Sequence, residues 1–189
     1  MSILTDKLPD AVLIDGKEYP INTDFRVAIK IIEAFESEEL TGFEKNEIML
    51  EELYGENNIP DNIPEALEMA LRFLDGDCDE TENSPDEEDS SGDCRLYSFT
   101  QDARYIFSGI LQTHGIDITT QEMHWWKFIV LFMDLDKDCF FSQLLSIRSR
   151  LKKGTLTKEE RQWYNENKKI VDLPEHYSVE EEELLGRFF

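Results

Sequence analysis

Basic residues are scarce in this chain. Its 189 residues include 42 acidic and only 19 basic ones, which gives a formal net charge of −23 at pH 7. A surface of this charge repels nucleic-acid phosphates and anionic lipid head groups, so we expect no binding to nucleic acid and none to a membrane surface. The charge favours high solubility or docking onto a basic protein partner.

Cysteines and long apolar runs are also few. The three cysteines (Cys78, Cys94 and Cys139) are odd in number and scattered, which indicates a reducing compartment and not a disulfide framework. A Cys78–Cys94 bridge across the acidic stretch is conceivable. The longest purely apolar run, Phe128 to Met133, is far shorter than the roughly 20 residues of a membrane span. The first 16 residues lack both the basic segment and the long apolar segment of a secretory signal peptide, so we expect none.

The residues that are present predict a mostly α fold with a small N-terminal β-hairpin. Hydrophobic residues make up 40% of the chain and aromatic ones 11%, which is enough for a packed core. Asp15-Gly16 lies between two apolar runs, and this dipeptide is typical of a two-residue type I′ turn because both central positions need a positive φ. Capping signals predict helices that begin at Thr41 and Thr157, each followed three residues later by glutamate.

Helical periodicity predicts the remaining helices and the side chains that they bury. Helices are expected over 24–36, 41–54, 63–74, 103–114, 119–135, 138–151 and 157–173, with a last acidic one from Ser178. The predicted core stripes are Phe25, Ala28, Ile29 and Ile32; Ile63, Ala66, Leu67, Ala70, Leu71 and Leu74; Ala103, Ile106, Phe107, Ile110 and Leu111; Trp125, Phe128, Ile129, Phe132 and Met133; and Phe140, Leu144, Ile147 and Leu151.

An acidic stretch divides the chain into two parts. Residues 75–94 hold ten acidic residues and no basic one, and their only apolar side chains are two cysteines. Such a segment cannot bury enough surface to offset the entropy of ordering it. We therefore predict a multi-helix bundle interrupted by an acidic, disordered, flexible linker, with an N-terminal part over 1–74, the linker over 75–95 and a helical C-terminal part over 96–189.

One segment runs against the overall charge. Between Arg148 and Lys169 there are eight basic residues and three acidic ones. This local excess could dock the linker or the acidic C-terminal residues internally, or the segment could consist of ordinary solvated helix faces. The sequence leaves both interpretations open.

No motif predicts catalysis, a cofactor or a metal ion. The run that begins Asp75-x-Asp77-x-Asp79 lacks the glycine and glutamate that an EF-hand loop needs at its sixth and twelfth positions, and the run from Asp134 to Asp138 fails in the same way. His114 and His124, taken with Glu122 and Cys139, match no zinc spacing. No nucleophile elbow, phosphate-binding loop or dinucleotide fingerprint occurs. We therefore expect a protein that is not an enzyme.

The sequence resembles a tail-morphogenesis family of siphophages that infect Gram-positive bacteria. The residues that carry the resemblance are Ile106-Phe107, Gly115 to Ile118, His124-Trp125-Trp126-Lys127-Phe128, Ser146 to Ser149, Lys158 to Tyr164, Lys168 to Ile170 and Leu173-Pro174. The stretch from Leu8-Pro9 to Arg26 is similar too. The His-Trp-Trp-Lys-Phe block is the most specific element, and the resemblance covers nearly the whole chain except the acidic linker.

The resemblance implies a function in tail assembly. Genes of this family lie between those for the tail tube and the tape measure protein, which implies a chaperone in the host cytoplasm that holds the tape measure protein soluble and also meets tail tube subunits. An alternative from another class is an acidic inhibitor that mimics nucleic acid and blocks a host DNA-binding defence protein. The oligomeric state is not predicted.

Partner contacts are predicted at Trp126, Val130 and Trp163. Trp125 is in phase with the apolar stripe of its helix and is assigned to the core. Because adjacent helix residues point about 100° apart, Trp126 falls at the flank of that stripe together with Val130. We expect Trp126 to be partly exposed as an anchor for an apolar helix, whereas a wider core helix would bury both rings.

Overall fold

The computed structural model describes residues 5–37, 39–76 and 96–173. Within these ranges it contains eight helices and one two-stranded sheet, which confirms the predicted fold class. None of the helices in these ranges is long and apolar enough to cross a membrane. Residues 77–95 of the predicted linker and the helix predicted from Ser178 lie outside the described residues.

The chain divides into two compact units. The described residues of the first unit are 5–37, 39–76 and 122–128, and those of the second are 96–121 and 129–173. The domain boundaries predicted near residues 74 and 95 stay a prediction.

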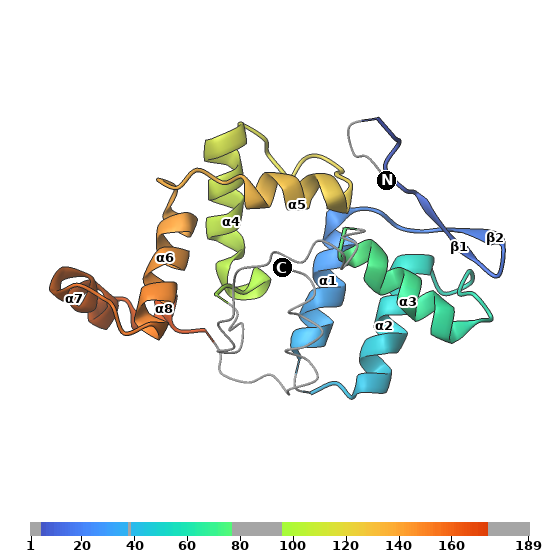
Figure 1. The fold of residues 1–189 in the computed structure, drawn as a ribbon, viewed down its shortest axis with the longest axis horizontal. Coiled ribbons are helices and arrows are strands. Elements are labelled where there is room, and N and C mark those ends of the chain that lie inside the picture. The colour runs from blue at the N-terminus through green and yellow to red at the C-terminus, as the bar shows by residue number, and fades with distance from the viewer. Residues whose placement is uncertain (1–4, 38, 77–95, 174–189) are drawn as a thin grey trace, which may run out of the picture. The chain divides into compact units, whose positions relative to one another are not determined.

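The first unit begins with the predicted β-hairpin (Figure 1). Strand β1 (Ala11–Ile14) pairs in antiparallel register with β2 (Lys17–Pro20). The turn residues Asp15 and Gly16 have φ angles of 49° and 74°, as the type I′ prediction requires. Asn62 donates a hydrogen bond to the Asp15 carboxylate at 3.0 Å, which holds this turn against the start of the third helix.

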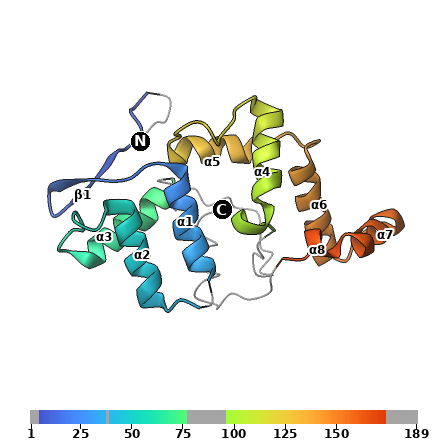
Figure 2. The ribbon, with the colours of Figure 1, turned by 180° about the vertical axis from the view of Figure 1, so that it is seen from behind.

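Three capped helices follow the hairpin: α1 (Phe25–Glu36), α2 (Gly42–Tyr54) and α3 (Ile63–Leu74). The predicted capping box is present, because Glu44 Oε2 accepts the backbone N–H of Thr41 at 2.8 Å and the Thr41 hydroxyl accepts the N–H of Glu44. Gly55 ends α2 with a φ of 80°. The two opposite views in Figures 1 and 2 show these helices beside the hairpin.

Two buried polar side chains join α2 to its neighbours. Lys45 is buried and donates to the carbonyl oxygen of Phe35 at 2.9 Å, in the last turn of α1, where a cation is favourable. Its burial lowers the pKa of the Lys45 ammonium. The Tyr54 hydroxyl donates to the carbonyl oxygen of Ala66 at 2.8 Å, and burial raises the pKa of Tyr54 to about 12.

Residues 122–128 return to the first unit and pair with the start of α1. The Phe25 N–H donates to the carbonyl oxygen of Met123 at 2.9 Å, and the Trp125 N–H donates to that of Thr23 at 2.7 Å. The ring of Phe128 is stacked on the ring of Phe25, with centroids 4.6 Å apart. Helix α5 (Trp125–Met133) begins in this segment.

The second unit contains the end of α5 and four further helices: α4 (Phe99–His114), α6 (Phe140–Lys152), α7 (Lys158–Glu166) and α8 (Lys168–Val171). Gly115 ends α4 with a φ of 68°, and the capping box predicted at Thr157 and Glu160 is present. The core of the unit contains a cluster of aromatic rings with centroids 5.1–6.1 Å apart, formed by Tyr97, Phe99, Phe132 and Phe141.

A buried ion pair joins α4 to α6. Arg148 is 2% exposed and forms a bidentate pair with Asp102, which is fully buried, through N···O contacts of 2.5 and 2.9 Å. The same guanidinium donates to the carbonyl oxygens of Leu96 at 2.9 Å, Ile170 at 2.8 Å and Val171 at 2.7 Å. All five donors of the arginine therefore have an acceptor, which is the condition for burying such a charge at a tolerable cost.

Because of this ion pair, the buried faces of α4 and α6 differ from the predicted core stripes. Since Asp102 and Arg148 point inward, the buried face of α4 runs through Asp102, Ile106 and Ile110, and that of α6 through Phe141, Leu144 and Arg148. Ala103 and Leu111 were expected in the core and are exposed. Phe140, also expected there, is 41% exposed, and Ile147 is only half-buried. The stripes were predicted from the spacing of apolar residues alone. Such a prediction does not include a buried ion pair, which here sets the rotation of both helices about their axes.

The predicted helix over 119–135 is shorter than expected. The Asp117 carboxylate accepts hydrogen bonds from the Thr119 N–H at 2.9 Å and from its hydroxyl at 2.6 Å, and these bonds lower the pKa of Asp117. They fold this stretch into a turn that competes with the helix, so α5 begins only at Trp125. Met133, predicted in the core, is 72% exposed at the end of α5.

Replacing Arg148 by methionine should cost about 3–5 kcal/mol of unfolding free energy, because the Asp102 carboxylate would remain buried without its partner. Lysine should not restore the loss, since one ammonium cannot serve five acceptor contacts. The double variant Asp102→Leu/Arg148→Met should recover part of it, although three carbonyl oxygens still lose their donor.

Urea unfolding of the single and double variants measures these differences. The matched control is Arg150→Met on the same helix, whose ion pair is partly exposed and should be worth less than about 1 kcal/mol. Equal losses for Arg148→Met and Arg150→Met would show that the buried pair is not central to this unit.

Candidate functional site

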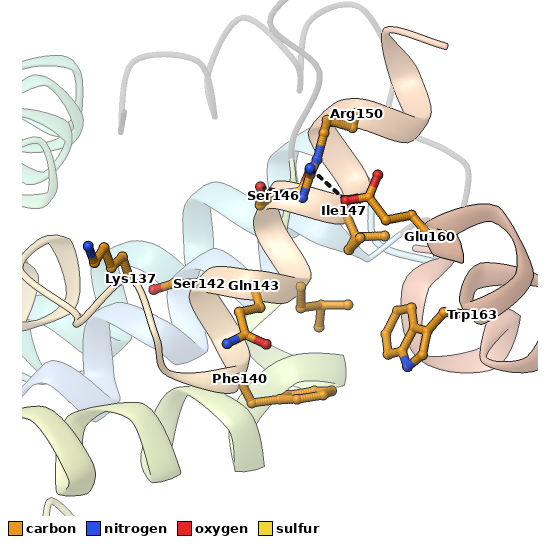
Figure 3. A pocket seen from close by; sticks show the side chains of 10 residues that line it. Lys137, Phe140, Ser142, Gln143, Ser146, Ile147, Arg150, Glu160 and Trp163 are labelled. Atoms are coloured by element: carbon orange, nitrogen blue, oxygen red, sulfur yellow. Dashed lines mark hydrogen bonds and ion pairs between the residues drawn. The ribbon is translucent and has the colours of Figure 1, made fainter. Parts of the chain in front are cut away.

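A groove lies between α6 and α7 in the second unit (Figure 3). Its volume is about 540 Å³. The walls come from the loop before α6, from the outward face of α6 and from α7. The residues that line it are Lys137, Phe140, Ser142, Gln143, Leu144, Ser146, Ile147, Arg150, Glu160 and Trp163.

Large apolar side chains form the walls of this groove. Phe140 is 41% exposed, and Ile147 and Trp163 are half-buried. Tyr105 of α4 supports Phe140 through a ring contact with centroids 4.7 Å apart. Phe140 and Ile147 face the groove because burial of Arg148 turns them away from the core. Figure 3 shows them on α6, with Trp163 facing them from α7.

An ion pair across the groove fixes α7 against α6. Arg150 Nη1 lies 2.6 Å from Glu160 Oε1, and Arg150 Nη2 donates to the Ser146 hydroxyl at 3.1 Å. The other carboxylate oxygen of Glu160 accepts the Thr157 N–H at 2.9 Å as part of the capping box. Glu160 therefore both begins α7 and holds it to α6, so the apolar walls face each other at a set distance.

Two of the three predicted partner-binding residues are accessible. Trp163 lines the groove, together with Phe140 and Ile147. Val130 is 52% exposed on α5 and is not part of the groove lining. The structure thus places Trp163 and Val130 on different surfaces, and a partner role for either stays a prediction.

The expected exposure of Trp126 is wrong. Its ring is 7% exposed and that of Trp125 is 2% exposed, so both are buried. The indole N–H of Trp125 donates to the carbonyl oxygen of Leu74 at 2.8 Å, and that of Trp126 donates to Phe73 at 2.7 Å. These carbonyls belong to the last turn of α3, where helix geometry leaves acceptors without intrahelical partners. Because both indole N–H groups find acceptors at the end of α3, the two adjacent tryptophan rings can be buried together.

The two histidines considered for zinc binding are hydrogen-bonded within the protein. His124 Nδ1 accepts the Trp126 N–H at 3.1 Å, so its Nε2 carries the proton that is donated to the carbonyl oxygen of Pro9 at 2.9 Å. His114 Nε2 lies 2.8 Å from the carbonyl oxygen of Leu131. Among the residues that the structure describes, no three His, Cys, Asp or Glu side chains gather as a metal site would require.

Asp136, in one of the two acidic runs considered for calcium binding, is hydrogen-bonded to nearby residues. Asp136 Oδ1 accepts the Asp138 N–H at 2.8 Å, and the Asp136 N–H donates to the Thr113 hydroxyl. These bonds form the turn before α6, in which Cys139 is buried as the N-cap residue. The other run begins at Asp75, and its later members lie outside the described residues.

The groove was not found from the sequence, apart from Trp163. Phe140 and Ile147 were assigned to the core, and Arg150 and Glu160 were given no paired role. One signal was present: Arg148 lies four residues after Leu144, in phase with the true core face. A charged residue at that spacing needs a buried partner, and finding Asp102 would have predicted that Phe140 and Ile147 face outward.

Comparison with models of known protein families gives a match. The model of a family described as Bacteriophage Gp15 protein matches residues 4–173, which is most of the chain. No curated protein and no solved structure matches. The matched residues include the described residues of both units and every residue that lines the groove.

Trp126→Ala should destabilise the protein as strongly as Trp125→Ala, by about 3–5 kcal/mol, because both rings are buried. Trp126→Phe keeps most of the packing and removes the N–H donor, so it should cost about 1 kcal/mol, since the Gly76 N–H still reaches the Phe73 carbonyl oxygen. Denaturant midpoints of the three variants measure this. A loss below about 1 kcal/mol for Trp126→Ala would contradict the burial of its ring.

Trp163→Ala should cost about 1 kcal/mol of unfolding free energy or less, because no residue of α7 is buried. The same measurement as for the other tryptophans applies, with Trp125→Ala as the matched core variant. A loss near that of Trp125→Ala would assign Trp163 to the core of the second unit instead of an accessible groove wall.

Proposed function

The chain belongs to the bacteriophage Gp15 family, and from this premise we propose that it is a tail assembly protein that binds the tape measure protein of its phage and keeps it soluble. The observation that carries the proposal is the family match over residues 4–173, read with the sequence resemblance to tail-morphogenesis proteins. The protein acts by binding and not by catalysis. Tail tube subunits are further partners, and the host cytoplasm is where the complex forms.

The accessible apolar surfaces of the second unit support a chaperone role. A chaperone for apolar helices needs surfaces that accept apolar side chains in place of water. The groove between α6 and α7 offers such a surface, with Phe140, Ile147 and Trp163 in its walls. Val130 and Met133 on α5 are 52% and 72% exposed and provide a second apolar surface.

The charge of the chain supports the same role. At a net charge of −23, copies of the protein repel one another. A complex of this protein with the tape measure protein would also be strongly negative, so its copies would repel one another and stay in solution. The alternative function, mimicry of nucleic acid, needs a fixed array of carboxylates, and no observation favours it.

Co-expression with the tape measure protein of the same phage tests the proposal. The soluble fraction of the tape measure protein should rise, and the two proteins should purify together. A charge-matched unrelated acidic protein is the control for unspecific solubilisation. If the tape measure protein is equally insoluble with and without this chain, the chaperone function is refuted.

A further inference from the structure

The outer edge of strand β1 is open. In an antiparallel pair, residues whose backbone groups face the partner strand alternate with residues whose groups face away from it. The Ile21 N–H donates to the carbonyl oxygen of Asp10 at 3.0 Å, which sets this alternation for the pairs that follow toward the turn. Ala11 and Leu13 therefore direct their N–H and carbonyl groups away from β2. Within the described ranges no hydrogen bond reaches these groups.

Hydrogen bonds close this edge at both ends. The Pro9 carbonyl oxygen, the preceding acceptor along the edge, accepts the Nε2 proton of His124 at 2.9 Å. Beyond the other end, the Asp15 N–H donates to Glu65 Oε2 at 3.2 Å. The stretch between them offers the two N–H donors and two carbonyl acceptors of its outward-facing residues. Such a row of backbone groups is complementary to a short extended segment and to no other secondary structure.

The two edges of the sheet differ in composition. Strand β2 contains Lys17, Glu18 and Pro20, and charged residues and proline are the ones that keep an edge from pairing. Lys17 donates to the Tyr19 hydroxyl at 3.3 Å, on the face of the hairpin opposite Leu13. Strand β1 consists of Ala-Val-Leu-Ile and has no such residue, and Leu13 is 59% exposed. This composition leaves the edge of β1 free to accept a further strand.

Two carboxylates lie at the end of the open edge next to the turn. The Asn62 amide donates to Asp15 at 3.0 Å and to Glu65 at 2.9 Å, which holds the two acidic side chains together. Neither carboxylate forms an ion pair in the described part of the chain. At the other end of the edge, Asp10 is already paired with Lys7. A basic side chain of an added strand is therefore attracted to the turn end.

We propose that the edge of β1 from Ala11 to Leu13 binds an extended segment of a partner protein, which adds a third strand to the sheet. The segment carries an apolar side chain beside Leu13 and a lysine or arginine at the end that meets Asp15 and Glu65. The inference does not depend on the proposed function, because the edge recognises a strand through its backbone, whatever protein supplies it.

A second copy of this chain fits the edge less well. Antiparallel pairing of two β1 strands would place Ala11 of each copy opposite Leu13 of the other. The same register would bring Asp15 of each copy beside Asp10 of the other, and like charges next to each other across strands are destabilising. The net charge of −23 adds a general repulsion between copies. A segment with a basic end meets neither penalty.

Three labelled peptides of about eight residues test the proposal. All share a core of alternating valine and threonine; one ends in arginines, one in glutamates, and the third is the arginine peptide with its central residues N-methylated. The methylated peptide keeps the charge and side chains but has no central N–H donors. In fluorescence anisotropy with the full chain, the arginine peptide should bind at least about tenfold more tightly than either of the others.

Variants of the full chain locate the binding on β1. Leu13→Pro removes an outward N–H and spares the bonds between β1 and β2, so it should weaken binding of the arginine peptide by about tenfold or more. Glu18→Pro makes the same change on the outer edge of β2 and should change binding by less than about twofold. Denaturant midpoints of the two variants show whether the hairpin is intact, and the methylated peptide tests the backbone pairing without altering the protein.

Several outcomes overturn the proposal. Equal binding of the arginine peptide and its methylated form would show attachment through charge alone. Equal effects of Leu13→Pro and Glu18→Pro would show that the edge of β1 is not the site. A dimer in sedimentation that Leu13→Pro dissociates would identify a second copy of this chain as the occupant. A tenfold gain in affinity on removal of residues 1–4 would identify the chain's own N-terminal residues.

Discussion

The pairing of Arg148 with Asp102 is the constraint on which the second unit depends. The guanidinium reaches Asp102 on α4 and carbonyl oxygens before α4 and in α8, so three helices are organised around one side chain. A buried charge tolerates no loss of its acceptors, which fixes the rotation of α4 and α6 about their axes. The outward position of Phe140 and Ile147, and hence the groove, follows from that rotation.

The block that resembles tail-morphogenesis proteins most specifically has a structural role in the first unit. His124 is hydrogen-bonded to Pro9, shortly before the hairpin. The two tryptophans donate hydrogen bonds to the end of α3, and Phe128 stacks on Phe25 at the start of α1. Its aromatic residues are therefore explained by packing and by hydrogen bonds to carbonyl oxygens in the last turn of α3. The accessible groove lies in the other unit, where less distinctive segments carried the resemblance.

Local chemistry was predictable from the sequence, whereas the pairing of distant side chains was not. The Asp15-Gly16 turn and the capping boxes at Thr41 and Thr157 need only residues a few positions apart, and all were confirmed. The buried faces of α4 and α6 depend on two charged residues 46 positions apart. The burial of Trp126 likewise depends on Phe73, 53 positions earlier. In the candidate site, the sequence predicted Trp163 as a contact residue, but it did not predict that Phe140 and Ile147 face it.

The cap on α3 also has a consequence for biosynthesis. The residues that close the end of this helix are the two tryptophans of α5, which leave the ribosome only after the first part of the second unit has been made. A nascent chain that ends before residue 122 lacks both indole donors and the strand-like pairing with the start of α1. The first unit therefore cannot complete its packing in the order of translation, and its final closure is a late, long-range event.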